Sequence, residues 1–219
     1  MTEGPQSNPV LKDLEEWGYP PRAAVVIRHS ERNDSAGWPL SPRGHELAVA
    51  LGRGFGVYRE VRAFHSPALR CEQTAIDISQ GAVEAGSVFT DVRPERVLGF
   101  SYLLDGDRPG ADVNRLPEGF LRNWISGRLD PALVQPLDVK AQQHLALVLR
   151  TLSEAADEPR LDVFVTHELN VLMMEEGVLG IRHDELGNPE ILDGVTFRLD
   201  HGDASARYRN RIRRGGLSR

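Results

Sequence analysis

The sequence predicts an α/β fold with a mostly parallel central sheet, helices on both faces and a small cap insertion. Short apolar runs alternate along the chain with segments of helical periodicity, which is typical of parallel sheets. The run at 23–27 is entirely apolar, as expected for a strand that is buried on both faces. At 219 residues, the chain is long enough for one such domain with an insertion.

Each element follows from local patterns. Ser41-Pro42 and Ser66-Pro67 each predict a helix start, with serine as the N-cap and proline at the first helical position. Apolar residues at helical spacing predict an amphipathic helix over 137–156, and Gly180 is expected to end a helix over 170–179. The predicted strands are 23–27, 61–65, 87–92, 161–166 and 195–199.

Composition divides the chain into three parts. Residues 1–22 are expected to be a tail with a short helix near 11–17, and 23–205 a single α/β domain. The segment from about 93 to 136 is rich in Gly, Pro and Asp and too long for a plain connection, so it is predicted to be an insertion that covers the site. The basic residues of 206–219 are expected to form a solvated C-terminal tail.

Charge and cysteine usage exclude several classes of function. A net charge of −6 argues against general nucleic-acid binding. No apolar run approaches the roughly 20 residues that span a bilayer, and no secretory signal is evident, so no membrane partner is expected. The single cysteine, Cys71, excludes an intramolecular disulfide and is typical of a reducing compartment, so we expect the cytoplasm. Oligomeric state stays open.

Charged and imidazole side chains follow three predicted strands, where the carboxyl ends of parallel strands place ligands. Guanidinium groups match phosphate oxygens, and the first turn of a helix attracts anions. The pattern therefore favours an anion site, and no convincing metal-ligand spacing accompanies it. The groups are Arg28-His29 with Arg32, then Arg70 after the second strand, and His167-Glu168.

These segments resemble the histidine phosphatase superfamily, which also contains the phosphoglycerate mutases. Arg28-His29-Ser30 is similar to the family's Arg-His-Gly motif. The run at 66–75 matches Ser-Pro-x-x-Arg-x-x-Gln-Thr-Ala, and 165–167 matches the segment that ends in the second catalytic histidine. The resemblance covers roughly 23–200, with the motifs in the family's order.

The resemblance implies a phosphomonoesterase that forms a phosphohistidine on His29, without a metal or other cofactor. It places Arg28, Arg32, Arg70 and His167 around the phosphate, so that His167 is both catalytic and phosphate-binding. Glu168 is the expected general acid. The alternative acids are Asp105 and, less well placed, Glu95 of the insertion. The expected partner is a small phosphorylated substrate, or a phosphoprotein.

Two other functions stay open. A phosphoglycerate-type mutase would use the same nucleophile, but the modest insertion favours hydrolysis. A non-catalytic phosphate- or phosphoprotein-binding module is the third possibility, because Ser30 replaces the family's glycine and could crowd the site or donate a hydrogen bond. Among the remaining histidines, His144 is expected at the surface, and Cys71 is expected to be a small buried side chain.

Overall fold

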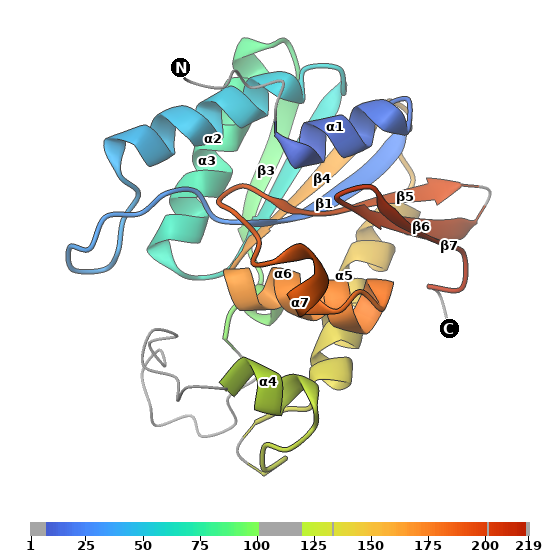
Figure 1. The fold of residues 1–219 in the computed structure, drawn as a ribbon. Helices are drawn as coiled ribbons and strands as arrows, with labels where there is room; N and C mark the ends of the chain where they lie inside the picture. Colours follow the sequence, from blue (N-terminus) through green and yellow to red (C-terminus); the bar gives the residue numbers. More distant parts are fainter. Residues whose placement is uncertain (1–7, 101–119, 133, 201, 218–219) are drawn as a thin grey trace.

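The computed structural model describes residues 8–100, 120–132, 134–200 and 202–217, and its centre is one seven-stranded sheet (Figure 1). The strand order is β3-β2-β4-β1-β5-β6-β7. The first four strands in this order are mutually parallel, whereas β5, β6 and β7 are added antiparallel to their neighbours. The predicted fold class is confirmed, with a parallel core. The strands are β1 (Arg22–Arg28), β2 (Glu60–His65), β3 (Val88–Pro94), β4 (Arg160–Thr166), β5 (Gly194–Asp200), β6 (Asp203–Tyr208) and β7 (Arg211–Arg214).

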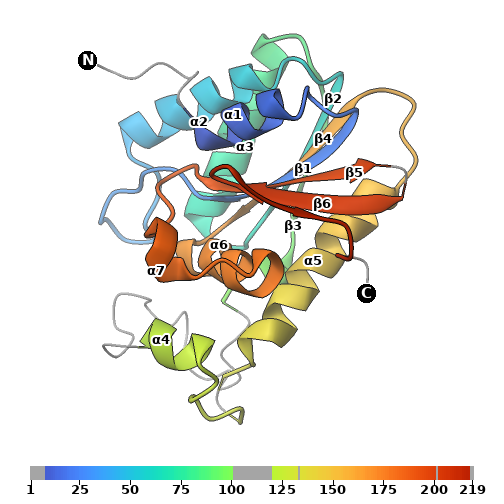
Figure 2. The same cartoon turned by 45° about the vertical axis from the view of Figure 1, so that its right-hand side comes forward.

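Helices cover both faces of this sheet (Figures 1 and 2). One face is covered by α1 (Pro9–Glu16), α2 (Pro42–Gly54) and α3 (Leu69–Glu84). The opposite face carries α5 (Leu137–Ser153) and α6 (Glu168–Met174). The shorter elements are the 3-10 turn η2 (Arg96–Leu98), α4 (Phe120–Ile125), the π-helical turn η4 (Glu175–Leu179) and α7 (His183–Leu186).

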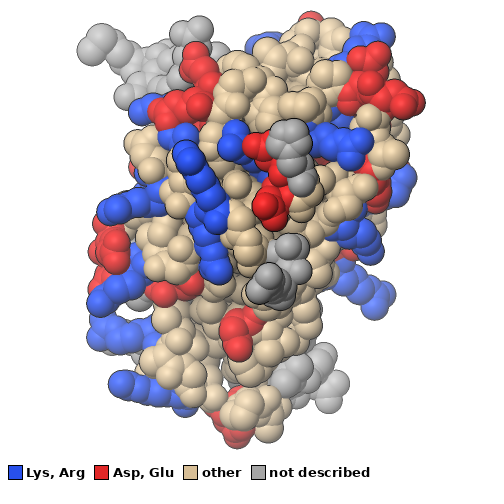
Figure 3. Space-filling model, turned by 90° about the vertical axis from the view of Figure 1, so that its right-hand side faces the viewer, with Lys and Arg blue, Asp and Glu red and all other residues tan. Residues whose placement is uncertain are grey.

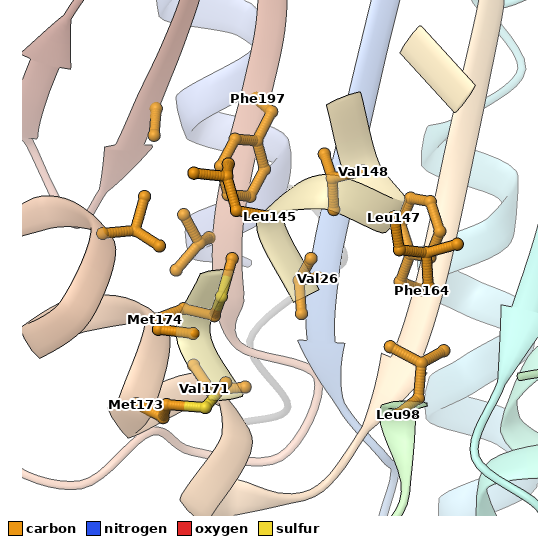
Figure 4. Packing of buried hydrophobic residues seen from close by; sticks show 14 of the residues in the cluster. Val26, Leu98, Leu145, Leu147, Val148, Phe164, Val171, Met173, Met174 and Phe197 are labelled. Carbon is orange, nitrogen blue, oxygen red and sulfur yellow. The ribbon is translucent and has the colours of Figure 1, made fainter. Parts of the chain in front are cut away.

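Strand β1 supplies both cores because its side chains alternate between the two faces. Ala24 and Val26 pack in the cluster under α5 and α6, which Figure 4 shows from close by. Val25 and Ile27 pack in the second cluster, under α1, α2 and α3. Burial on both faces explains why the sequence of this strand is apolar without interruption.

The C-terminal segment differs from the prediction. Residues 206–219 were expected to form a solvated basic tail, but β6 and β7 add two strands to the sheet. Ala204, Ala206 and Tyr208 alternate into the core, and the buried Arg207 is held by an ion pair with Asp13 of α1 at 2.8 Å. On this side of the molecule, acidic and basic side chains are intermixed (Figure 3).

Other boundaries lie close to the predictions. Ser41 caps α2 by accepting a hydrogen bond from the Gly44 backbone N–H at 2.9 Å. Helix α6 runs into η4, which ends at Gly180 with a φ of 69°, a left-handed conformation that suits glycine. Between β3 and α5, the described residues form η2 and α4. None of the described helices has the length and apolar character needed to cross a membrane.

Candidate active site

The ends of β1, β2 and β4 bring the candidate residues together. These strands are adjacent and parallel, with Arg28 opposite Thr166 and His65 opposite Val165. The pairing continues one residue beyond each strand, because the His29 N–H donates to Thr166 O and the Ser66 N–H donates to Val165 O, both at 2.9 Å. His29, Ser66 and His167 therefore lie at one edge of the sheet, as the apolar runs predicted.

His29 is held in one neutral tautomer. Its Nδ1 lies 2.7 Å from Ser30 O and must carry the proton, since a carbonyl only accepts. Its Nε2 accepts a hydrogen bond from Arg70 Nε at 3.0 Å, so the lone pair lies on Nε2. The ring is only 7% exposed, and burial, followed by the nearby arginine charges, lowers the pKa of His29 to about 3. An imidazole in this state is a nucleophile at neutral pH.

His167 faces the same arginine from the other side. Arg70 Nη2 lies 3.1 Å from Nδ1 of His167, and because arginine only donates, the ring proton is on Nε2. That N–H donates to Ser66 Oγ at 2.8 Å. Burial and the charge of Arg70 lower the pKa of His167 well below its usual value. The two imidazoles lie edge to face, with ring centroids 5.7 Å apart.

Arg70 reaches both histidines because it lies in the first turn of α3, as predicted. Its guanidinium stands between them with Nε toward His29 and Nη2 toward His167. One cation therefore touches both imidazoles, which favours their neutral forms and places positive charge where an anion would be held.

Arg28 is held from two sides. Its Nη1 donates to Pro189 O at 2.7 Å, and its Nη2 pairs with Glu168 Oε2 at 2.9 Å. Its Nε is buried and has no hydrogen-bond partner among the described residues. A buried N–H without a partner is costly, so the two hydrogen bonds of the terminal nitrogens are what hold this guanidinium in place.

Arg32 and Trp38 form the outer wall of the site. Trp38 lies under two guanidinium groups, with Arg32 Cζ 5.0 Å and Arg70 Cζ 5.6 Å from its ring centroid. Arg32 also pairs with Asp34 at 2.8 Å. Trp38 has a φ of 48°, which is uncommon for a residue other than glycine. The loop at 33–39 thus connects the predicted phosphate ligand Arg32 with Arg70 through an aromatic ring.

Polar side chains fix the start of the predicted insertion next to His167. Leu98 O accepts from Thr166 Oγ1 at 2.6 Å and from Asn170 Nδ2 at 2.9 Å. Lys140 Nζ, from α5, donates to Val97 O at 2.6 Å. Phe100, two residues after Leu98, stacks on His167 with ring centroids 4.0 Å apart. The insertion therefore begins in direct contact with the edge of the sheet that carries His167.

The two alternative acids have different outcomes. Glu95 lies after β3 and pairs with Arg150 of α5 at 3.5 Å. Asp105 lies outside the described residues. Glu168, the first candidate, is the first residue of α6, and its ion pair with Arg28 joins it to the predicted phosphate ligands.

Ser30 does not crowd the site. Its hydroxyl donates to Gly44 O at 2.7 Å, and its N–H donates to Thr74 Oγ1 at 3.0 Å. A Cβ on Gly44 would lie 2.0 Å from Glu31 O, so glycine is required where α2 approaches this turn. The serine that replaces the family's glycine thus connects the turn after β1 with α2.

Two expectations for single residues have opposite outcomes. Cys71 is fully buried as expected, and burial raises the pKa of its thiol to about 12, so it is not an activated nucleophile. His144 was expected at the surface, and this is wrong. Its ring is fully buried in α5, Nδ1 lies 3.1 Å from Lys140 O, and burial lowers its pKa to about 3.

Sequence reasoning missed three site residues. Ser66 was predicted to cap α3, but this helix begins at Leu69 with Ala68 as a cap without a side-chain hydrogen bond, and the Ser66 hydroxyl contacts His167 instead. Phe100 and Trp38 have no local pattern that separates them from packing residues, although Trp38 does stand between two predicted arginine ligands in the sequence. Among the described residues, no cluster of three or more His, Cys, Asp or Glu could hold a metal ion.

The fold is that of the histidine phosphatase and phosphoglycerate mutase structures, which confirms the expected resemblance at the level of the fold. No protein-family model matches the chain, and no curated protein matches it by sequence. The three matching solved structures described next are each less than 25% identical to it.

Three of them illustrate the likeness. A mutant of phosphoserine phosphatase from Entamoeba histolytica, in complex with phosphoserine, is 15% identical with a TM-score of 0.55, over 89% of this chain and 97% of that chain. The mycobacterial glucosyl-3-phosphoglycerate phosphatase is 20% identical with a TM-score of 0.56, over 88% and 95%. The phosphoglycerate mutase from Bacillus anthracis is 18% identical with a TM-score of 0.56, over 90% and 94%.

Proposed function

We propose that this protein is a phosphomonoesterase that works through a phosphohistidine on His29 and needs no metal ion. The observation that carries the proposal is the state of His29: a neutral ring with its lone pair on Nε2, directed at the guanidinium of Arg70. A phosphate held by that guanidinium would bring its phosphorus next to the nucleophile, and positioning is the main requirement of phosphoryl transfer.

In the first step, Nε2 of His29 forms a bond to phosphorus in line with the ester oxygen, and the P–O bond to the leaving group breaks. The ring becomes positively charged, and the hydrogen bond from Nδ1 to Ser30 O stabilises that charge. Glu168, in its protonated form, gives its proton to the departing oxygen. Arg28, Arg32 and Arg70 stabilise the equatorial oxygens through charge and hydrogen bonds, and His167 joins them by donating its Nε2–H to the phosphate in place of Ser66 Oγ.

In the second step, water attacks the phosphohistidine. The Glu168 carboxylate takes the proton of the water, the N–P bond breaks, and inorganic phosphate leaves while His29 returns to its neutral form. Four groups that donate to anionic oxygens could supply the stabilisation for which other phosphoryl-transfer enzymes use metal ions.

The comparisons support a small phosphorylated substrate. Two of the matching structures are of a phosphoserine phosphatase, one in complex with phosphoserine and one with 3-phosphoglyceric acid. For this chain we propose the same chemical class, a small organic phosphate monoester, with a phosphoprotein as the other possibility.

The test is hydrolysis of p-nitrophenyl phosphate in the presence of EDTA by wild type, His29→Ala and His45→Ala. His45 is a matched control, since it is a histidine paired with Asp77 at 2.7 Å and is outside the proposed machinery. We expect turnover by wild type and His45→Ala and none by His29→Ala. Turnover that survives in His29→Ala refutes the nucleophile, and activity that EDTA removes and a divalent metal restores refutes metal independence.

The likeness to a phosphoglycerate mutase favours one alternative, transfer of the phosphoryl group back to an organic acid. Incubation with 3-phosphoglycerate separates the two, because a mutase produces 2-phosphoglycerate whereas a phosphatase releases inorganic phosphate. A protein that does neither, but binds inorganic phosphate, would be the binding module.

A further inference from the structure

The tight turn between β6 and β7 places one arginine over the segment that leads into β5. Arg209 and Asn210 form this turn with φ values of 44° and 70°, and positive φ at both residues is typical of a two-residue hairpin turn. The Arg209 guanidinium lies over the ring of Tyr208, with Cζ 5.1 Å from the ring centroid. The guanidinium donates to Leu186 O at 2.7 Å, to Asn188 O at 3.3 Å and, through Nε, to Asp193 Oδ2 at 2.8 Å.

Asp193 is the centre of these contacts. It is 1% exposed, and besides Arg209 its carboxylate accepts hydrogen bonds from Tyr208 OH at 3.0 Å and from the Gly194 N–H at 2.8 Å. A buried carboxylate with a cation and two further donors is fixed in place, whereas one without its cation is strongly disfavoured.

The same segment holds Arg28. Its Nη1 donates to Pro189 O at 2.7 Å, and its backbone N–H donates to Asp193 O at 2.9 Å. The Leu192 N–H in turn donates to Arg28 O at 3.1 Å. The segment from 186 to 193 therefore lies between the two arginines. It contacts Arg28 through Pro189, Leu192 and Asp193. It contacts Arg209 through Leu186, Asn188 and Asp193.

We propose that Arg209 is a positioning residue for the phosphate site: by fixing the segment 186–193, it sets the place and direction of the Arg28 guanidinium. The fixed direction matters because both terminal nitrogens of Arg28 have partners, Pro189 O for Nη1 and Glu168 for Nη2, so the place of its positive charge depends on the segment that holds it. The C-terminal hairpin then contributes to the site through the segment 186–193, which Arg209 contacts. This inference rests on the proposed function, since it assumes that Arg28 binds phosphate.

The test uses the full chain and inorganic phosphate as the probe. Arg209→Met keeps the length of the side chain and removes the guanidinium, and Arg211→Met on the exposed strand β7 is the matched control. Hydrogen exchange of peptides that contain Arg28 and 186–193 reports the position of the segment, and calorimetry reports the dissociation constant of phosphate. In Arg209→Met the buried carboxylate of Asp193 loses its cation. The double variant Arg209→Met with Asp193→Asn removes that carboxylate charge, and it replaces the single variant in the same measurements if the single variant fails to fold.

We expect faster exchange at Arg28 and at 186–193 in Arg209→Met only, with a dissociation constant about ten-fold higher than that of wild type, a coupling typical of residues in one hydrogen-bonded network. In an Arg28→Met background the same substitution is expected to change the dissociation constant by less than about two-fold, because its effect passes through Arg28. A merely structural role would weaken binding equally in both backgrounds.

The outcomes separate the two proposals. Unchanged exchange at Arg28, or an equal loss of affinity in both backgrounds, overturns the role of Arg209. Faster exchange at Arg28 in a protein whose wild type neither binds nor releases phosphate overturns the proposed function and leaves the positioning of Arg28 by Arg209 intact.

Discussion

Replacing His29 by glutamine is expected to make the protein less sensitive to acid. In the folded wild type the pKa of His29 is lowered to about 3, whereas the unfolded chain has the ordinary value of about 6.5. Between about pH 3 and pH 6.5, His29 therefore binds a proton in the unfolded state but not in the native state. The stability of wild type therefore falls as the pH falls below about 6.5, and this loss ends near pH 3.

The size of the effect follows from the two pKa values. Each pH unit within this window costs about 1.4 kcal/mol, and allowing for partial titration near its upper limit, His29 alone removes about 2 kcal/mol between pH 7 and pH 5. Other buried titratable groups, such as Glu175 with a pKa raised to about 8, are common to both proteins and cancel in the difference. Glutamine does not titrate, so His29→Gln is expected to lose about 2 kcal/mol less than wild type over the same interval.

The assay is urea unfolding at pH 7 and pH 5 in buffers without phosphate, because a bound anion would stabilise the native state. Ser30→Ala is the control, since it changes the neighbouring residue without adding or removing a titrating group. Its stability is expected to follow wild type in parallel. Parallel curves for wild type and His29→Gln would refute the conclusion that His29 is buried in its neutral form, and with it the state of the nucleophile on which the proposed mechanism depends.

Three further predictions concern the surroundings of His29. Glu168→Gln is expected to slow the hydrolysis of alkyl phosphates by about 10²-fold or more. Hydrolysis of p-nitrophenyl phosphate is expected to slow far less, because its leaving group needs no proton. Steady-state kinetics on both substrates checks this, and an equal loss of rate on both counts against Glu168 as the acid. Trp38→Leu removes the ring that contacts Arg32 and Arg70, and we expect a several-fold higher KM with little change in kcat. Trp38→Phe is expected to restore the wild-type KM. A KM that stays at the wild-type value in Trp38→Leu contradicts the role of the ring. Ser30→Ala loses the hydrogen bond to Gly44 O, so the free energy of unfolding is expected to fall by about 1 kcal/mol. Steady-state kinetics is expected to show unchanged kcat and KM. Lost activity would mean that the hydroxyl acts on the substrate.

The edge that carries both histidines could be predicted from the sequence because parallel strands all end at the same side of the sheet. A parallel strand that is buried on both faces brings the residues that follow it to the carboxyl edge of the sheet, and β1 and β4 are each followed by a histidine. Once these runs pair in register, His29 and His167 come to the same edge. The position of Arg70 follows from the helix start after β2, which is again a local feature.

Other residues could not be placed in this way because their roles depend on partners distant in the sequence. Ser41-Pro42 and Ser66-Pro67 have the same local chemistry, yet Ser41 caps its helix while Ser66 contacts His167, which is 101 positions away in the sequence. The same holds for the C-terminal strands. Arg207 in β6 looks like part of a solvated basic run, and its burial is favourable because Asp13 and Glu16 of α1 pair with it.

Two of the proposed phosphate ligands, Arg28 and Arg32, are paired with carboxylates, and one of these carboxylates belongs to the proposed general acid Glu168. In the structure Arg28 is paired with Glu168, and Arg32 is paired with Asp34. A phosphate dianion that takes the Arg28 guanidinium would remove the cation from Glu168 and place negative charge beside it. In the proposed mechanism, binding of the substrate therefore releases Glu168 from its ion pair with Arg28 and leaves this carboxyl group beside the ester, and departure of inorganic phosphate restores the pair.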